Sequence, residues 1–398
     1  MLADPQSTMT RPAASRRMLE IQPPVIPIVG ELIRARPGTI SLAQGVVYYP
    51  PPPGALTRIP EFLERDDGRR YGPVQGMPAL IGAIRHKLRR ENGIDVDVAG
   101  QRIVVTAGGN MAFLNALLAI TDPGDEVILP LPYYFNHEMA VRMVDCRPVF
   151  VSTDIEYQID VDRLRAAVTP RTRAIVTVSP NNPSGAVYPR ATLSAVNALC
   201  RDSDIYHISD EAYENFVHAG DGHFSPAGTV GSGAHTISLF SLSKSHALAG
   251  WRVGYMTVPA HLYESILKVQ DTNLICANLL AQDVATACIE RESAYRDEKI
   301  AVLNGVRREV LNTLAEIGPG CTCSAATGAF YVLLRLDSPM TPMAVVRRLI
   351  EDDAVAVLPG DAFGLEGCHL RVSYGALDPQ TVIVGMERLV RGLRKILA

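Results

Sequence analysis

The chain has 398 residues, of which 47% are hydrophobic and 20% are charged. This composition is ordinary for a globular protein, and the length allows two domains with a large core. The 38 basic and 42 acidic residues give a net charge of −4, and the main basic cluster, residues 85–90, is predicted to be one solvated helix face. We therefore expect no nucleic-acid partner, and no membrane span, because no run of about 18 apolar residues occurs.

The seven cysteines are odd in number and lack the spacing of a disulfide framework. Cys321 and Cys323 have no second pair at the spacing of a zinc site, and the nine histidines show no metal-ligand spacing. No metal site is predicted, and reduced thiols in a cytoplasmic protein are the simplest interpretation. Residues 1–20 are predicted to be a flexible N-terminal arm, because residues 1–17 are polar and rich in proline, serine and arginine.

The first structural patterns along the chain predict a helix and, further on, a loop that could bind phosphate. Residues 27–36 predict a short helix with proline in its first turn. Residues 103–105 predict a strand, and Gly108, Gly109 and Asn110 lie between it and a predicted helix over 111–118. Backbone N–H groups at a glycine-rich helix start suit an anion such as phosphate, although a plain strand-to-helix loop has the same pattern.

Four later apolar runs predict further strands, and each is followed by polar or aromatic side chains. Residues 127–129 precede Tyr134, residues 174–178 precede Asn182, residues 205–209 precede Asp210 and Tyr213, and residues 236–240 precede Ser241 and Lys244. Open α/β sheets bind ligands at the carboxyl ends of their strands. The sequence therefore predicts one ligand site that gathers these side chains.

The segment from Ser241 to Arg252 carries the most reactive candidate in the chain, Lys244. A lysine amine can form a Schiff base with an aldehyde cofactor. The nearby Ser241 hydroxyl and Arg252 guanidinium could hold the phosphate of such a cofactor. Taken alone, a lysine between two serines is more often a surface residue.

Further motifs complete a pattern that resembles a known family. They are Asn182-Pro183-Ser184-Gly185, Gly328-Ala329-Phe330-Tyr331, and residues 369–375, which contain Arg371. With the lysine segment they follow the order found in pyridoxal-phosphate (PLP) aminotransferases of class I/II, so residues 22–398 resemble the aspartate aminotransferase superfamily of fold type I. One departure lies on the substrate side, where Gly45 is followed by Val-Val-Tyr and the family often has x-Pro-Asp.

The resemblance implies an α/β fold with two domains. Residues 50–285 would form a large PLP-binding domain with a mostly parallel sheet flanked by helices. Residues 21–49 and 286–398 would form a small α+β domain. The family is usually homodimeric with shared active sites, which would place Tyr71 at the cofactor phosphate of the partner subunit.

The resemblance also assigns roles to the candidate residues. Lys244 would bind PLP and move the substrate α-proton, and Asp210 would keep the cofactor ring nitrogen protonated. Tyr134 would stack on the ring, Tyr213 and Asn182 would donate to its phenolate oxygen, and Arg371 would bind the substrate carboxylate. The remaining contacts would come from Gly108, Gly109, Asn110, Ser241 and Arg252 for the cofactor, and from Gly45 and Asn182 for the substrate.

The function implied is transfer of an amino group from an L-amino acid to a 2-oxo acid. A neutral or aromatic amino acid is predicted, because the connection over 271–280, which in similar dimers reaches the neighbouring site, contains no arginine for a second carboxylate. A PLP-dependent lyase, decarboxylase or oxidase remains open, because such enzymes share the cofactor residues. Of the histidines, His207 is predicted to be a core residue, and His246 could touch the cofactor site.

Overall fold

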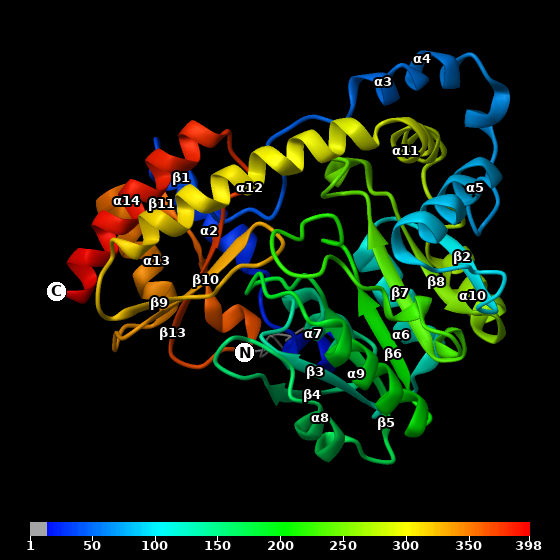
Figure 1. Cartoon of the computed structure of the whole chain (residues 1–398), viewed down its shortest axis with the longest axis horizontal. Helices are drawn as coiled ribbons and strands as arrows, with labels where there is room; N and C mark the ends of the chain where they lie inside the picture. Colours follow the sequence, from blue (N-terminus) through cyan, green and yellow to red (C-terminus); the bar gives the residue numbers. More distant parts are fainter. Residues whose placement is uncertain (1–13) are drawn as a thin grey trace, which may run out of the picture.

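The computed structural model describes residues 14–398 of the chain. Residues 1–13 of the predicted arm lie outside the described residues. The rest of that arm contains a short helix, α1 (Arg16–Glu20). Figure 1 shows a large sheet with its helices beside a smaller part, in which blue segments from the first residues described lie beside orange and red segments from the C-terminal part of the chain.

The described residues form a large sheet of seven strands in the order β2-β8-β7-β6-β5-β3-β4. All neighbouring strands pair in parallel except around β8, which is antiparallel to β2 and to β7. The strands are β2 (Gln101–Thr106), β3 (Glu126–Leu131), β4 (Arg147–Ser152), β5 (Thr172–Val178), β6 (Tyr206–Asp210), β7 (Thr236–Ser241) and β8 (Gly254–Pro259). The predicted mostly parallel sheet is therefore confirmed.

Helices cover both faces of this sheet (Figure 1). One face packs against α6 (Gly109–Ile120) and α10 (Tyr263–Asn273), and the other against α8 (Val161–Ala167) and α9 (Arg190–Asp202) and against α5 (Pro78–Lys87) and α11 (Leu279–Arg291). Strands buried on both faces need apolar side chains at successive positions, which explains the uninterrupted apolar runs in the sequence. Shorter helices border this domain: α3 (Pro53–Leu56), α4 (Arg58–Leu63) and α7 (Phe135–Met143).

The smaller part combines both ends of the described chain. Its four-stranded antiparallel sheet has the order β12-β13-β10-β9, and β1 pairs in parallel with β11. The strands are β1 (Ile40–Ser41), β9 (Cys321–Cys323), β10 (Tyr331–Leu336), β11 (Val355–Ala356), β12 (Leu358–Pro359) and β13 (Cys368–Ser373). The helices are α2 (Val25–Ala35), α12 (Ser293–Ala315), α13 (Pro342–Asp353) and α14 (Pro379–Leu397).

One buried cluster ties these two ends together. Val29 and Leu42, near the N-terminus, pack in the same cluster as Leu349 and Met386. This packing supports the predicted division into residues 50–285 and residues 21–49 with 286–398, which we keep as a proposal. The proposed boundary after residue 285 lies within α11, and the long α12 follows it (Figure 1).

The connection expected over 271–280 is shorter, because α10 continues to Asn273 and α11 begins at Leu279. Within residues 14–398, no helix is long and apolar enough to cross a membrane.

Candidate active site

The predicted ligand site is a pocket at the carboxyl ends of the central strands. Because β5, β6 and β7 are parallel neighbours, the segments that follow them meet at one edge of the sheet. The pocket is lined by Gly109, Asn110, Tyr134, Val178, Asn182, Asp210, Ala212, Tyr213, Ser241, Ser243, Lys244 and Arg252. The fold thus brings together every predicted cofactor-binding residue except Gly108 and Tyr71.

Lys244 lies between the pocket and a second, adjoining cavity. Its Nζ donates to the backbone oxygen of Gly45 at 2.6 Å. Tyr49 reaches the same segment, because its hydroxyl donates to the backbone oxygen of Ser245 at 3.2 Å. The loop that departs from the family pattern therefore contacts the lysine segment directly.

The surroundings of the Lys244 amine favour its neutral form. Burial, together with the nearby guanidinium groups of Arg371 and Arg252, lowers its pKa from 10.5 to about 8, against an opposing effect of Asp210. A neutral amine is the form that attacks a carbonyl or accepts a proton. A lysine with this pKa therefore offers a substantial reactive fraction near neutral pH.

The pH dependence of Lys244 reactivity follows from this pKa. Because the folded-state pKa is lowered, the neutral fraction rises about tenfold per pH unit below pH 8 and levels off above it. Arylation of the cofactor-free protein by 1-fluoro-2,4-dinitrobenzene, whose own reactivity does not change with pH in this range, should show this plateau when mapped to Lys244 by mass spectrometry. A rate that continues to rise beyond pH 10, as for a lysine of ordinary pKa about 10.4, would contradict the assignment.

Arg371 is a buried cation without a carboxylate partner among residues 14–398. Its side chain is 1% exposed, Nη1 donates to Asn182 Oδ1 at 2.9 Å, and Nη2 donates to the Ala43 carbonyl at 2.5 Å. Its Nε has no hydrogen-bond acceptor. The guanidinium carbon lies 4.5 Å from the ring centre of Tyr331. A buried guanidinium held only by neutral groups has unused capacity for an anion.

Asp210 is oriented by a residue that the sequence patterns did not single out. His137 Nε2 lies 3.1 Å from Asp210 Oδ2, and the backbone N–H of Ala212 donates to Oδ1 at 3.0 Å. The His137 ring stacks on Phe113, with ring centres 4.1 Å apart. These contacts limit the rotation of the carboxylate that lines the pocket. In the sequence, only its position three residues after Tyr134 connects His137 with the site, and no motif includes it.

A pair of tyrosines links the pocket to the adjoining cavity. The hydroxyls of Tyr213 and Tyr331 are 2.7 Å apart, and Asn182 Nδ2 donates to Tyr213 at 3.5 Å. Burial raises the pKa of Tyr331 to about 12, so its hydroxyl keeps its proton near neutrality. A Cβ on Gly45 would lie 2.3 Å from the Tyr331 hydroxyl, so the close approach requires glycine at position 45. Tyr331 was missed as a site residue, although its motif was recognised.

The start of α6 lines one side of the pocket, next to Arg252. Gly108 has a φ of +84°, and a Cβ there would lie 2.5 Å from Arg252 Nη2. Arg252 donates to the carbonyls of Ala107 and Ala249, both at 3.0 Å. Asn110 Oδ1 accepts from the Tyr134 hydroxyl at 3.4 Å. Glycine at 108 therefore leaves room for the arginine beside the helix N-terminus, where an anion is favoured.

Three other candidates lie elsewhere. Tyr71 is 80% exposed and does not line the pocket of its own chain. His246 is buried against Ser245 and does not line the pocket either. His207 is a core residue as predicted: it contacts Thr177 and Asn197, and burial lowers its pKa to about 3.

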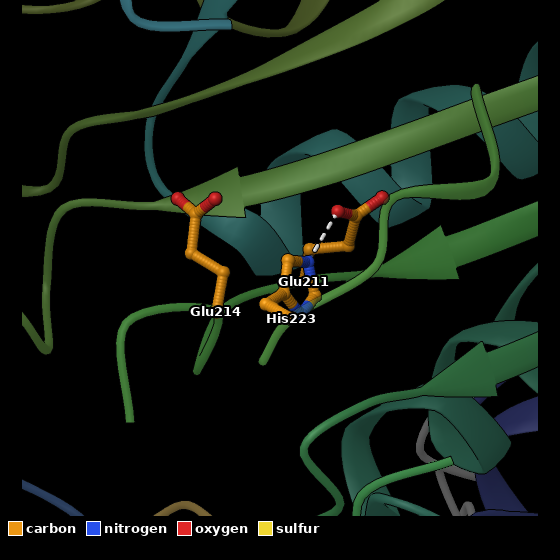
Figure 2. Close-up of side chains that lie close together, drawn as sticks. All are labelled: Glu211, Glu214 and His223. Carbon is orange, nitrogen blue, oxygen red and sulfur yellow. Dashed lines mark hydrogen bonds and ion pairs between the residues drawn. The ribbon is translucent and has the colours of Figure 1, made fainter. Parts of the chain in front are cut away.

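After Asp210, Ala212 and Tyr213 line the pocket, whereas Glu211 and Glu214 belong to a second polar cluster. Glu211, Glu214 and His223 each have a ligand-type atom within 4.8 Å of the others. Figure 2 shows the hydrogen bond from His223 to Glu211, with Glu214 beside them. Lys87 forms an ion pair with Glu214, and Asn92 donates to the other oxygen of Glu214 at 2.7 Å. The lysine ammonium already supplies the cation of this cluster, which is therefore a buried ion-pair network.

This network corrects the interpretation of residues 85–90 as one solvated face. Lys87 is 5% exposed and points inward, whereas Arg89 at the end of the segment is exposed and pairs with Asp95 at 2.8 Å. Lys87 lies on the buried face of α5, three and seven residues after the buried Ile84 and Leu80, and α5 ends there before a π-helical turn, Leu88–Asn92. The fold, and not the local charge pattern, decides which basic residue is buried.

Removal of Lys87 should destabilise the protein strongly. In Lys87→Met, Glu214 would remain as a mostly buried carboxylate without its cation, and we expect a loss of about 3–5 kcal/mol of unfolding free energy. Arg89→Met is the matched control, for which we expect a change within about 1 kcal/mol because that pair is exposed. Urea unfolding followed by circular dichroism measures both. Equal effects of the two substitutions would show that the network does not depend on Lys87.

The fold and the pocket define an α/β protein in which a helix N-terminus and a buried lysine of lowered pKa lie at the carboxyl ends of the strands. The aminotransferase class I and II family matches residues 37–389, and the chain belongs to this family. Its fold is that of the aspartate-aminotransferase-like enzymes of fold type I. The protein is therefore an aminotransferase-family enzyme, which agrees with the motif order in the sequence.

Named relatives fall into more than one substrate class. An aromatic aminotransferase of Arabidopsis thaliana, ISS1, is 33% identical over 393 residues, which cover 96% of this chain and 97% of the relative. An aspartate/prephenate aminotransferase of Thermus thermophilus is 36% identical over 331 residues, 81% of this chain and 83% of the relative. The structure of an aspartate aminotransferase from Thermus thermophilus with maleate superimposes with a TM-score of 0.88, at 31% identity, over 96% of this chain and 100% of that one.

Proposed function

We propose that this enzyme binds PLP in the pocket and transfers the amino group of a neutral or aromatic L-amino acid to a 2-oxo acid. The observation that carries the proposal is the position of Arg371. Its guanidinium has an unused N–H and lines the same cavity as Lys244, next to the cofactor pocket. An amino acid with its carboxylate on this arginine would present its α-carbon toward the lysine.

The pocket residues fit PLP by their chemistry. The start of α6, Ser241 and Arg252 would hold the phosphate, and Tyr134 would stack on the ring. Asp210, held by His137, would accept from a protonated ring nitrogen, and Tyr213 and Asn182 would donate to the ring oxygen. When bound, PLP supplies an electron sink for the negative charge that develops at the substrate α-carbon.

Side chains of this protein would orient the substrate and move its α-proton. Arg371 would orient the substrate through its carboxylate, and its position above the Tyr331 ring fixes the plane of the guanidinium. Lys244 Nζ, with a pKa of about 8, would accept the α-proton and return it to a neighbouring carbon. Tyr331 would keep the Tyr213 hydroxyl aimed at the pocket.

The lining of the substrate cavity supports a neutral or aromatic side chain. The cavity has a volume of about 320 Å³ and is bordered by Ile26, Val46 and Phe135. Of the described residues that line it, only Lys244 and Arg371 are cationic, and both have other tasks. The connection over 274–278, between α10 and α11, also contains no arginine. A second carboxylate would therefore lack a charge-assisted partner in these segments.

A spectral titration with single amino acids tests this proposal. Phenylalanine, tyrosine or leucine should convert the visible band of the PLP-loaded enzyme into the near-ultraviolet band of pyridoxamine phosphate, and a 2-oxo acid should restore the visible band. Aspartate should do so at least about tenfold less efficiently, since one charge-assisted contact is missing. Release of ammonia or CO₂ without pyridoxamine phosphate would instead indicate a lyase, oxidase or decarboxylase.

We also propose that the enzyme is a homodimer and is located in the cytoplasm. Tyr71 is 80% exposed and does not line the pocket of its own chain, as expected of a side chain that serves a partner subunit. The seven cysteines are free, which fits a reducing compartment. Light scattering of the purified protein should give a mass near twice 43.1 kDa.

A further inference from the structure

The loop that begins at Gly45 contacts the lysine segment at two points. The Gly45 carbonyl accepts a hydrogen bond from Lys244 Nζ at 2.6 Å. Four residues later, the Tyr49 hydroxyl lies 3.2 Å from the Ser245 carbonyl oxygen and 3.4 Å from the Lys244 carbonyl oxygen. The loop therefore contacts both the amine of Lys244 and the backbone that carries its side chain. Tyr49 directly follows the Val-Val-Tyr sequence that departs from the family pattern.

The backbone around Lys244 has few hydrogen bonds of its own. Residues 242–246 form a turn after β7, so no helix or strand fixes them. Ala247, next to this turn, donates to the Lys244 carbonyl at 3.2 Å and has a φ of +57°, which is unfavourable for a residue with a Cβ atom. Among residues 14–398, the Tyr49 hydroxyl is the only donor to the Ser245 carbonyl. The turn therefore depends on an anchor from outside the segment.

Tyr49 is itself held in place. Its side chain is buried, and its ring makes edge contacts with the rings of Tyr48 and Tyr295, with ring centres 5.5 Å and 6.3 Å apart. The Tyr295 hydroxyl donates to the Pro50 carbonyl at 2.9 Å, directly after Tyr49. Burial raises the pKa of the Tyr49 hydroxyl, so it keeps its proton and remains a donor near neutral pH. Tyr49 is thus a fixed hydrogen-bond donor beneath the lysine turn.

We propose that Tyr49 is a positioning residue for Lys244: its hydroxyl fixes the backbone of residues 244–245 and so keeps Nζ between the cofactor pocket and the substrate cavity. This inference rests on the role that we propose for Lys244. Lys244 lines both cavities, whereas Tyr49 lines neither, so Tyr49 acts only through the lysine. Misplacement of a reacting group lowers the rate of the chemical step even when substrate binding is unchanged.

The position of Nζ also determines the charge state of the amine. Nζ lies 5.8 Å from the ring centre of Tyr213, and the charged groups that act on it are Arg371, Arg252 and Asp210. Burial is the largest cause of the lowered pKa of Lys244. A turn without its anchor admits water to the amine, and the pKa then rises toward the ordinary lysine value of about 10.4.

Tyr49→Phe in the full-length protein tests the inference, because it removes the hydroxyl and keeps the ring. Arylation of Lys244 by 1-fluoro-2,4-dinitrobenzene is measured against pH in the cofactor-free protein. We expect a midpoint about 0.5 pH unit above that of the wild type, which makes the rate at pH 7 about threefold lower. In the PLP-loaded enzyme, kcat should fall about tenfold, and KM should stay within about twofold.

Tyr374→Phe is the matched control. Tyr374 is also buried, its hydroxyl donates to the Ala329 carbonyl at 3.2 Å, and it lines neither cavity. This variant should lose a similar amount of thermal stability and keep the wild-type midpoint and kcat. A Tyr49→Phe midpoint at or below the wild-type value, or a kcat within twofold of the wild type, would overturn the inference.

The arylation profile separates this inference from the proposed function, because it requires neither PLP nor turnover. A raised midpoint in Tyr49→Phe, with a wild type that catalyses no transamination, would support the role of Tyr49 and remove the proposed function. An active wild type, with the same arylation profile in Tyr49→Phe, would overturn the inference and leave the proposed function in place.

Discussion

Lys244→Ala should lose at least about four orders of magnitude of transamination activity, because general base catalysis alone contributes up to about 10⁴-fold and covalent attachment of the cofactor is lost as well. The purified variant should also lack the visible band of covalently bound PLP. Lys244 makes one hydrogen bond through Nζ, to the Gly45 carbonyl, so we expect the fold to remain intact. Activity with a 2-oxo acid acceptor and the absorbance spectrum measure the two effects.

The controls separate a chemical effect from a structural one. Lys268→Ala alters an exposed lysine of α10 and should keep both activity and spectrum. Added methylamine should restore part of the activity of Lys244→Ala, since a small amine can occupy the space left by the side chain. Wild-type turnover in Lys244→Ala would remove the basis of the proposed function.

Arg371→Met should reduce kcat/KM by about 10³-fold for every amino-acid substrate. Two charge-assisted hydrogen bonds to a carboxylate are worth about 1.5–3 kcal/mol each, and methionine preserves most of the side-chain volume. The loss should be similar for neutral and aromatic substrates, because the α-carboxylate is common to them. Steady-state kinetics on a panel of amino acids, with thermal unfolding in parallel, measure the effect.

Arg371→Lys provides a graded comparison. The charge is kept but the planar fork is lost, so we expect an intermediate loss of about 10²-fold. Arg348→Met, in an exposed pair with Asp352, should leave the kinetics unchanged. If Arg371→Met folds normally and keeps kcat/KM within threefold, the substrate carboxylate binds elsewhere.

Local sequence patterns were sufficient to predict the strands and the site residues that follow them. Runs such as 174–178 and 236–240 are apolar because the sheet is buried on both faces, and their bounds in the structure differ by a few residues. Parallel strands end at one edge, so Asn182, Asp210 and Lys244 could be predicted to meet without coordinates. The roles of these residues stay predictions until the experiments above are done.

Contacts between distant segments could not be predicted in the same way. His137 and Asp210 belong to different elements, α7 and β6, and nothing in either segment indicates the other. The hydroxyls of Tyr213 and Tyr331 meet across 118 positions of sequence, and Lys87 pairs with Glu214 across 127. Each contact depends on how helices and the small domain pack on the sheet, which periodicity does not encode.

By itself, the sequence determined the α/β class, the order of the motifs and the set of side chains at the strand ends, because hydrophobic periodicity and turn residues act over a few positions. Only the tertiary structure decided which of these groups are buried and what they touch. The lowered pKa of Lys244 and the unpaired Nε of Arg371 arise because segments from both parts of the chain pack together and exclude water from these two side chains. Desolvation is a property of the assembled fold, so the reactivity of these residues is determined there and not in their local sequence.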